Sequence, residues 1–122
     1  MSEERPPTSE DVKLALDAFA VAVRSHYGTR LRDIVLFGSR ARGDGEADSD
    51  ADVAVILADG DWRYWREKMV LAGIAYDPLI EFGLHIQPWP ISLSEWNDPA
   101  SHRNPRFLAN IHRDARPIVV PP

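Results

Sequence analysis

Two aspartates at the start of an apolar stretch are the first residues in this sequence whose spacing suggests chemistry. Asp50 and Asp52 begin the segment "DADVAVIL", which is typical of a β-strand. Residues two apart on a strand point to the same face of a sheet, so the two carboxylates are expected side by side. Two close carboxylates do not both ionise readily without a counter-charge. Because Mg²⁺ is commonly bound by one or two carboxylates together with substrate phosphates, the pair predicts a Mg²⁺ site.

A glycine–serine pair upstream of the aspartates is suited to hold an anion. Gly38 and Ser39 end the apolar run "DIVLF", and Arg40 and Arg42 follow directly. Backbone N–H groups in such a turn can face a phosphate, and the arginines are expected beside it. A phosphate cradle next to a carboxylate pair indicates metal-assisted phosphoryl or nucleotidyl transfer.

Each part of this stretch also has a purely structural interpretation. Alone, "GSRARGDG" is consistent with a plain turn and "GDGEADSD" with a solvated acidic loop, while each arginine could be an exposed salt-bridge partner. Ser49 either orients Asp50 or caps the turn, and the structural role is favoured. A calcium-binding EF-hand is excluded because Ser49 and Val55 occupy the positions that need glycine and glutamate. Neither a Walker lysine nor a GxGxxG motif is present.

The elements that position these residues can be predicted from hydrophobic periodicity. A helix is expected from Thr8 or Ser9, either of which can cap it, to Gly28. The apolar runs "DIVLF" and "DVAVIL" predict two strands, of which the second is expected to be central in its sheet. A third strand is expected in "LHIQPWPIS", at an edge because of its prolines.

Helices are expected to alternate with these strands. One is predicted over residues 62–75, with Trp65 in the core, a break or kink near Tyr76 and Asp77, and a further helical turn in "PLIEFG" that ends at Gly83. A loop is expected over "LSEWNDPASHRN", then a short helix capped by Asn104, and "PIVV" predicts a brief terminal strand. The element order describes one small α/β domain over residues 9–120, preceded by a flexible tail over residues 1–8.

Composition narrows the classes of function. The chain has 122 residues, a net charge of −5 and no cysteine. The acidic balance argues against general nucleic-acid binding, which needs a basic face. The lack of cysteine excludes disulfides, and the polar N-terminus does not resemble a signal peptide. No apolar run approaches the roughly 20 residues that cross a bilayer, so a soluble cytoplasmic protein without a membrane partner is expected.

The stretch "LFGSRARGDGEADSDADVAVIL" closely resembles the signature of the DNA polymerase beta-like nucleotidyltransferase superfamily. In particular it is similar to the minimal nucleotidyltransferases, single-domain bacterial proteins often paired with HEPN-domain ribonuclease toxins. The ending "NPRFLANIHRDARPIVV" also resembles these proteins. The resemblance implies a small α/β nucleotidyltransferase fold, in which a mixed β-sheet is flanked by helices.

The resemblance also implies roles for matching residues. Gly38 and Ser39 would bind the triphosphate of a nucleotide, and Arg42 would help to neutralise it. Asp50 and Asp52 would be the catalytic carboxylates that hold Mg²⁺.

The third acid of this family is not evident. Members place another carboxylate on a later strand, whereas here "LHIQPWPIS" presents His85 and Gln87 on one face. Either residue is a candidate for the third position, and Glu81 is a further candidate if the register differs. This departure bears on catalysis more than on nucleotide or metal binding.

Three functions follow from this resemblance. The first is Mg²⁺-dependent transfer of a nucleoside monophosphate, AMP from ATP, to a hydroxyl of a protein partner, with this chain as the antitoxin of a HEPN-type toxin. The second is a catalytically weak nucleotide-binding module that neutralises its partner by contact alone. The third, small-molecule nucleotidylation, is disfavoured because no second domain is present to grip such a substrate.

Overall fold

A computed structural model describes residues 5–119 of the chain. Within this range, helices lie on both faces of a sheet with strand order β3-β2-β1-β4. The elements in chain order are α1 (Ser9–Tyr27), the 3₁₀ turn η1 (Gly28–Arg30), β1 (Leu31–Phe37), α2 (Gly38–Arg42), β2 (Ala51–Leu57), α3 (Tyr64–Phe82), β3 (Ile86–Ser92), α4 (Leu93–Asn97), the 3₁₀ turn η2 (Pro99–Ser101), α5 (Pro105–Asp114) and β4 (Arg116–Pro117).

The sheet is mixed, as expected from the resemblance. Strands β1 and β2 are antiparallel, as are β1 and β4, whereas β2 and β3 run parallel. β2 is central and nearly all of it is buried, and β3 lies at an edge. Both positions confirm the predictions from the unbroken apolar run of β2 and the prolines of β3.

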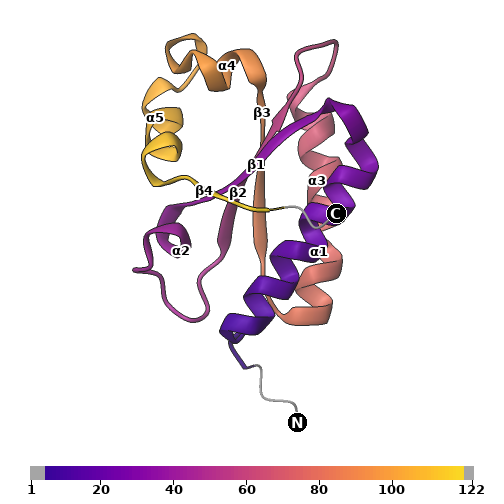
Figure 1. Cartoon of the computed structure of the whole chain (residues 1–122), viewed down its shortest axis with the longest axis vertical. Coiled ribbons are helices and arrows are strands. Elements are labelled where there is room, and N and C mark those ends of the chain that lie inside the picture. The colour runs from indigo at the N-terminus through magenta and orange to yellow at the C-terminus, as the bar shows by residue number, and fades with distance from the viewer. Residues whose placement is uncertain (1–4, 120–122) are drawn as a thin grey trace.

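The helices form two groups on opposite faces of the sheet (Figure 1). Helices α1 and α3 cover one face and enclose the larger core cluster, which includes Phe19, Val53 and Leu71. Helices α2, α4 and α5 lie on the other face, over a smaller cluster that includes Phe37, Ile56 and Leu108. Because successive strand residues alternate in direction, β1, β2 and β3 each contribute to both clusters.

Helix α1 follows directly from its sequence. The Thr8 side chain accepts a hydrogen bond from the Asp11 amide, and the Asp11 side chain accepts one from the Thr8 amide, which is a capping box. Phe19, Ala20 and Val23 recur at helical spacing and are buried. Residues 1–4 of the predicted tail lie outside the described residues.

Helix α3 is not broken near Tyr76 and Asp77, so that alternative was wrong, whereas the predicted end at Gly83 is confirmed. α3 continues through Pro78 to Phe82, although proline removes a helical hydrogen bond at a cost of about 3 kcal/mol. The apolar face of α3 explains this continuity, because Leu71, Ala75 and Pro78 are all buried against the large core. Packing of this face offsets the local cost. The helix begins at Tyr64, just after the predicted start at Trp62.

Two other expectations need correction. The segment predicted as a loop contains α4 and η2, and the Ser92 hydroxyl caps α4 by accepting from the Glu95 amide. Trp65 is not in the core, since its side chain is 69% exposed. The terminal strand exists as Arg116–Pro117, while Val120 of the predicted strand lies outside the described residues.

None of the described helices combines the length and hydropathy that crossing a bilayer requires.

Candidate functional site

The two aspartates lie together at the end of the sheet where β1 ends and where β2 and β3 begin. Asp52 is the second residue of β2, and it pairs with Phe37 at the end of β1 and with Gln87 near the start of β3. Asp50 immediately precedes β2 and accepts a long hydrogen bond of 3.4 Å from Gln87 Nε2. The carboxylates therefore share the face of the sheet that carries α2, α4 and α5, in line with their spacing in the sequence.

The surroundings of Asp52 oppose its ionisation. Burial raises the pKa of the Asp52 carboxyl above its ordinary value, and the neighbouring charge of Asp50 raises it further. Trp89, Lys68 and Arg42 act in the opposite direction. A divalent cation would favour the ionised form of both aspartates.

The residues present fit Mg²⁺. Within residues 5–119, no three His, Asp or Glu side chains gather closely enough to enclose a metal ion. The remaining ligands would therefore be waters and substrate phosphates, which is the usual arrangement for Mg²⁺. The site is suited to an ion that arrives with a nucleotide.

Gly38 lies directly against the Asp52 carboxylate. A Cβ added at Gly38 would sit 2.6 Å from Asp52 Oδ2, and the residue has a φ of 76°. Both features require glycine, because a side chain would collide with the carboxylate and would also strain the backbone. The predicted turn is in fact the start of α2, so Gly38 and Ser39 open a short helix beside the aspartates.

The two arginines of this stretch have different partners. Arg40 donates from Nε to the Ser49 carbonyl at 2.7 Å and from Nη2 to the Ala47 carbonyl at 2.9 Å. These bonds hold the loop before β2, so Arg40 has a structural role, although as a half-buried donor to backbone carbonyls and not as the exposed salt-bridge partner that was considered. Arg42 pairs with Asp44 at 3.1 Å and with Asp114 of α5 at 2.9 Å.

The pairing of Arg42 fixes α2 against α5. Asp114 is buried, and Arg113 and Arg42 together hold the pKa of its carboxyl below the ordinary value. Asp44, which the sequence suggested was only solvated, takes part in this network. Ser49 accepts a hydrogen bond from the Glu46 amide at 2.8 Å, so it caps the loop as favoured.

Both candidates for the position of the third acid, His85 and Gln87, lie beside the aspartates. Gln87 stands in register with Asp52, and His85 lies one residue before β3 with Nδ1 3.4 Å from Asp50 Oδ1. Glu81 lies near the end of α3, and among the described residues it forms no group with the two aspartates that could enclose a metal ion. The site therefore brings two acids, an amide and an imidazole together.

Lys68 and Trp89 belong to this site, although the sequence did not single out Lys68. The Lys68 ammonium reaches from α3 to the Pro88 carbonyl of the edge strand and lies 3.9 Å from the centre of the Trp89 ring. The buried Nε1 of Trp89 has no regular hydrogen-bond partner among the described residues, yet its N–H lowers the pKa of Asp52. For Trp89 the sequence did carry a signal, because residues two apart on a strand share a face and Trp89 is two residues after Gln87.

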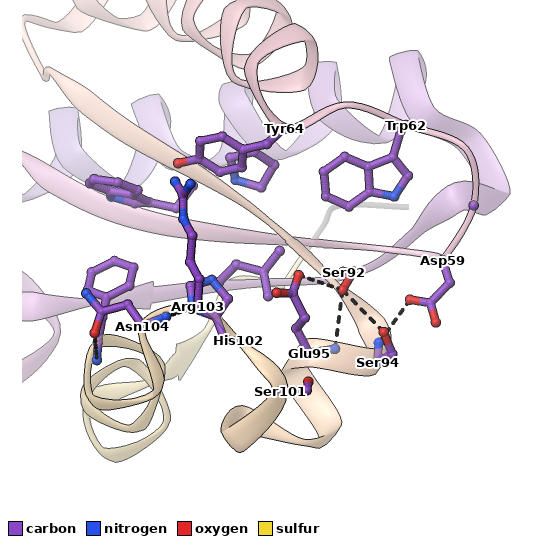
Figure 2. A pocket seen from close by; sticks show the side chains of 15 residues that line it. Asp59, Trp62, Tyr64, Ser92, Ser94, Glu95, Ser101, His102, Arg103 and Asn104 are labelled. Atoms are coloured by element: carbon purple, nitrogen blue, oxygen red, sulfur yellow. Dashed lines mark hydrogen bonds between the residues drawn. The ribbon is translucent and has the colours of Figure 1, made fainter.

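A groove extends from Trp89 along the same face of the sheet (Figure 2). Its volume is about 840 Å³, within the range of about 300–1,000 Å³ usual for small-molecule sites. Tyr64 and Arg103 approach each other at its rim, and the Arg103 guanidinium carbon lies 5.5 Å from the Tyr64 ring centre. The far end is polar, where Ser92 donates to Glu95. Neither aspartate of the pair lines the groove, and Trp89, which lowers the pKa of the Asp52 carboxyl, is the residue that the groove and the carboxylate site share.

Comparison with known proteins agrees with this geometry. Two inferred protein adenylyltransferases of Methanocaldococcus jannaschii are similar in sequence. One is 44% identical over 71 residues, which cover 55% of this chain and 70% of the relative. The other is 34% identical over 73 residues, which cover 60% of this chain and 50% of the relative, so the match spans half of that protein.

Two solved structures share the fold. An inferred nucleotidyltransferase from Sulfolobus solfataricus superimposes with a TM-score of 0.52 at 17% identity, over 80% of this chain and 83% of the other. A toxin–antitoxin structure with AMP-PNP gives a TM-score of 0.53 at 16% identity, over 86% and 73%. Residues 16–116, which carry the carboxylate pair, Gly38 and the whole sheet core, match the nucleotidyltransferase domain family. The chain therefore belongs to that family and is a nucleotidyltransferase.

Proposed function

We propose that this protein transfers AMP from ATP to a hydroxyl group of a protein partner in a Mg²⁺-dependent reaction. The observation that carries the proposal is the contact between Gly38 and Asp52, which joins the start of α2 to the carboxylate pair. The similarity to two inferred protein adenylyltransferases supports both the nucleotide and the protein acceptor.

The triphosphate would lie beside the start of α2. Amides in the first turn of a helix lack acceptors within the helix, and Gly38 leaves room for close approach. The Ser39 hydroxyl can donate a further hydrogen bond. Asp50 and Asp52 would hold Mg²⁺, which supplies charge neutralisation for the phosphates. Arg42 would add positive charge from its position against Asp44 and Asp114.

In the reaction, the acceptor oxygen attacks the α-phosphorus of ATP. A bond forms between that oxygen and phosphorus, the bond from phosphorus to the bridging oxygen breaks, and pyrophosphate leaves. The acceptor proton passes to solvent or to the imidazole of His85, since the Gln87 amide cannot accept it at neutral pH. Phosphoryl-type transition states depend mainly on positioning and charge, so slow transfer is expected even without a third carboxylate.

The proposed partner is a HEPN-type toxin, for which this chain would be the antitoxin in the cytoplasm. The resemblance to minimal nucleotidyltransferases supports this partner, and so does the likeness in fold to a toxin–antitoxin structure containing AMP-PNP. The competing function is a nucleotide-binding module that neutralises the toxin by contact. It is favoured by one observation, which is that an amide stands in register with Asp52 where an acid is expected.

Mass spectrometry of a co-expressed HEPN-type partner tests the proposal. Wild type should add one or more AMP units, and Asp52→Asn should lower the yield by about 10²-fold or more, because it removes charge stabilisation of the transition state. Gln87→Asp should raise the rate, since general-base help is typically worth about 10²–10⁴-fold. An unmodified partner that Asp52→Asn still neutralises in cells would establish the binding function instead.

Calorimetry with ATP separates binding from catalysis. We expect ATP to bind only with Mg²⁺, because unneutralised carboxylates repel a triphosphate. Tight binding without Mg²⁺ that survives in the Asp50→Asn, Asp52→Asn double variant would exclude this site.

A further inference from the structure

The outer surface of α3 carries a stripe of large apolar side chains. Trp65, Met69, Tyr76 and Ile80 are 69%, 71%, 59% and 67% exposed. Their spacings of four, seven and four residues place them on one side of a helix. Among the described residues, they are four of the seven exposed large hydrophobic side chains. Apolar residues gathered in this way on a soluble domain mark an interaction surface.

The stripe is symmetric about the middle of the helix. Two small residues, Ala72 and Gly73, occupy its centre and are exposed. Met69 lies three residues before Ala72, and Tyr76 lies three residues after Gly73. Trp65 and Ile80 lie seven residues outside the same two positions. An antiparallel copy of α3 would therefore bring large residues level with large ones and small residues level with small ones.

Charge is distributed with the same symmetry. Arg66 is exposed in the first half of α3, while Asp77 and Glu81 are exposed in the second half. At about 100° per residue, Arg66 and Asp77 fall on the same flank of the stripe. A two-fold axis keeps each flank against the same flank of the copy. Arg66 would then lie level with the span between Asp77 and Glu81 of the second copy, which makes opposite charges meet.

We infer that α3 is a self-association surface, at which two copies of this chain pair antiparallel about a two-fold axis at Ala72 and Gly73. The small residues at the centre allow the two helix axes to approach closely. The apolar residues on either side are then buried, and the charges at the rim fix the direction. Each of these features is self-complementary, which a two-fold interface requires and a different partner does not.

The proposed pairing leaves the catalytic face free. Helix α3 covers the face of the sheet opposite α2, α4 and α5, where the aspartates and the groove lie (Figure 1). A pair of copies would carry two sites that face away from the contact. A contact made mainly by one helix of about 28 Å is small, so we expect a weak, reversible dimer.

Introduced cysteines test the arrangement, because the natural chain has none. In the proposed pair, the two copies of residue 72 are about 1.5 Å apart along the helix axes, whereas the two copies of residue 69 are about 10 Å apart. Disulfides need Cα atoms within about 7 Å. Ala72→Cys should therefore form a covalent dimer under mild oxidation, and Met69→Cys, which is equally accessible, should not.

Charge reversal tests the direction independently, by sedimentation equilibrium at up to about 1 mM protein, since one-helix contacts fall in the weak class. Arg66→Glu and Asp77→Arg should each weaken association about tenfold, because each places like charges together. The double variant should restore association. Val21→Lys on α1, which changes another exposed apolar residue, should leave association unchanged.

Three results would overturn the inference. One is a monomer throughout the concentration range, which would leave the stripe to a different partner. Another is cross-linking of Met69→Cys as fast as Ala72→Cys, which would indicate a parallel or random contact. The third is a double charge variant that associates no better than the single variants.

Discussion

The two faces of the sheet differ in what their side chains do. On the face covered by α1 and α3, the core is almost entirely apolar, and its buried charge, Glu67, is bonded to the Tyr27 hydroxyl at 3.0 Å. On the face of α2, α4 and α5, a smaller core borders a carboxylate pair and a groove. The second face also contains the buried indole N–H of Trp89, for which residues 5–119 provide no regular hydrogen-bond partner.

The face covered by α1 and α3 therefore contributes mainly to stability, whereas the face of α2, α4 and α5 carries the residues of the proposed chemistry. Burial of apolar area stabilises the fold, and the larger cluster provides most of it. Burial of Asp52 next to Asp50 opposes folding, because the charged form loses solvation. The strands carry both functions at once, since alternate residues of β2 point to opposite faces. The large apolar core on one side of the sheet therefore supports a second side on which an acidic side chain is partly buried.

Matched leucine truncations would test the contrast most strongly. Leu71 of α3 and Leu108 of α5 are both fully buried, one on each face. Leucine-to-alanine changes in cores cost about 2–5 kcal/mol, depending on how far the cavity can relax. We expect Leu71→Ala near the upper limit, because its cluster is enclosed, and Leu108→Ala near the lower limit, because its cluster borders the groove. Denaturant unfolding measures both, and a reversed order would contradict the comparison.

Glycine substitutions would sharpen the contrast within the face that carries the aspartates. Gly38→Ala should weaken Mg²⁺-dependent nucleotide binding by about 10–100-fold, the range seen when the support of a metal ligand is disturbed. The new methyl group would displace the Asp52 carboxylate. Gly43→Ala is the control, because it also has a positive φ of 83° but meets nothing within 4 Å. Titration calorimetry should show near-normal binding for the control, and equal losses in both variants would mean that backbone strain alone is responsible.

The smallest expected effect concerns the charge of Asp52. Because burial raises the pKa of its carboxyl, the folded state is destabilised as pH rises from the ordinary value of 3.8 through the raised one. Asp52→Asn should therefore be more stable than wild type at pH 7 in metal-free buffer, and the difference should shrink as the solution is acidified. Thermal unfolding at several pH values measures this, with Mg²⁺ and ATP expected to stabilise only wild type. A variant less stable than wild type at pH 7 would show that the carboxylate contributes to the fold.

Several features of the site could be predicted because their signals are local. The family and the mixed α/β fold, predicted from the stretch around Gly38 and Asp52, are confirmed. The spacing of Asp50 and Asp52 predicted a shared face, because strand geometry repeats every two residues. The N-cap of α1, predicted as Thr8 or Ser9 and found at Thr8, and the Asn104 cap of α5 depend on only a few neighbouring residues. The assignment of these site residues to metal and nucleotide stays a prediction.

Other features depended on residues far apart in the chain. The sequence did not reveal that Arg42 would meet Asp114, which is 72 positions away. It also did not place Lys68 beside Trp89 and Asp52, because that contact needs α3 to pack along the edge strand. The continuation of α3 through Pro78 had the same origin, since distant core residues outweighed the local preference.

The sequence by itself predicted the residues of the proposed chemistry: a Gly-Ser pair directly after one apolar strand and two aspartates at the start of the next. These features can be predicted from the sequence alone because short-range backbone geometry fixes which side chains share a face. Only the tertiary structure decided which cations are already paired, which residue stands beside Asp52 at the third position, and which face of α3 is left in solvent. Those outcomes depend on strand register and on helix packing between distant segments, where many weak contacts are settled together by the whole fold.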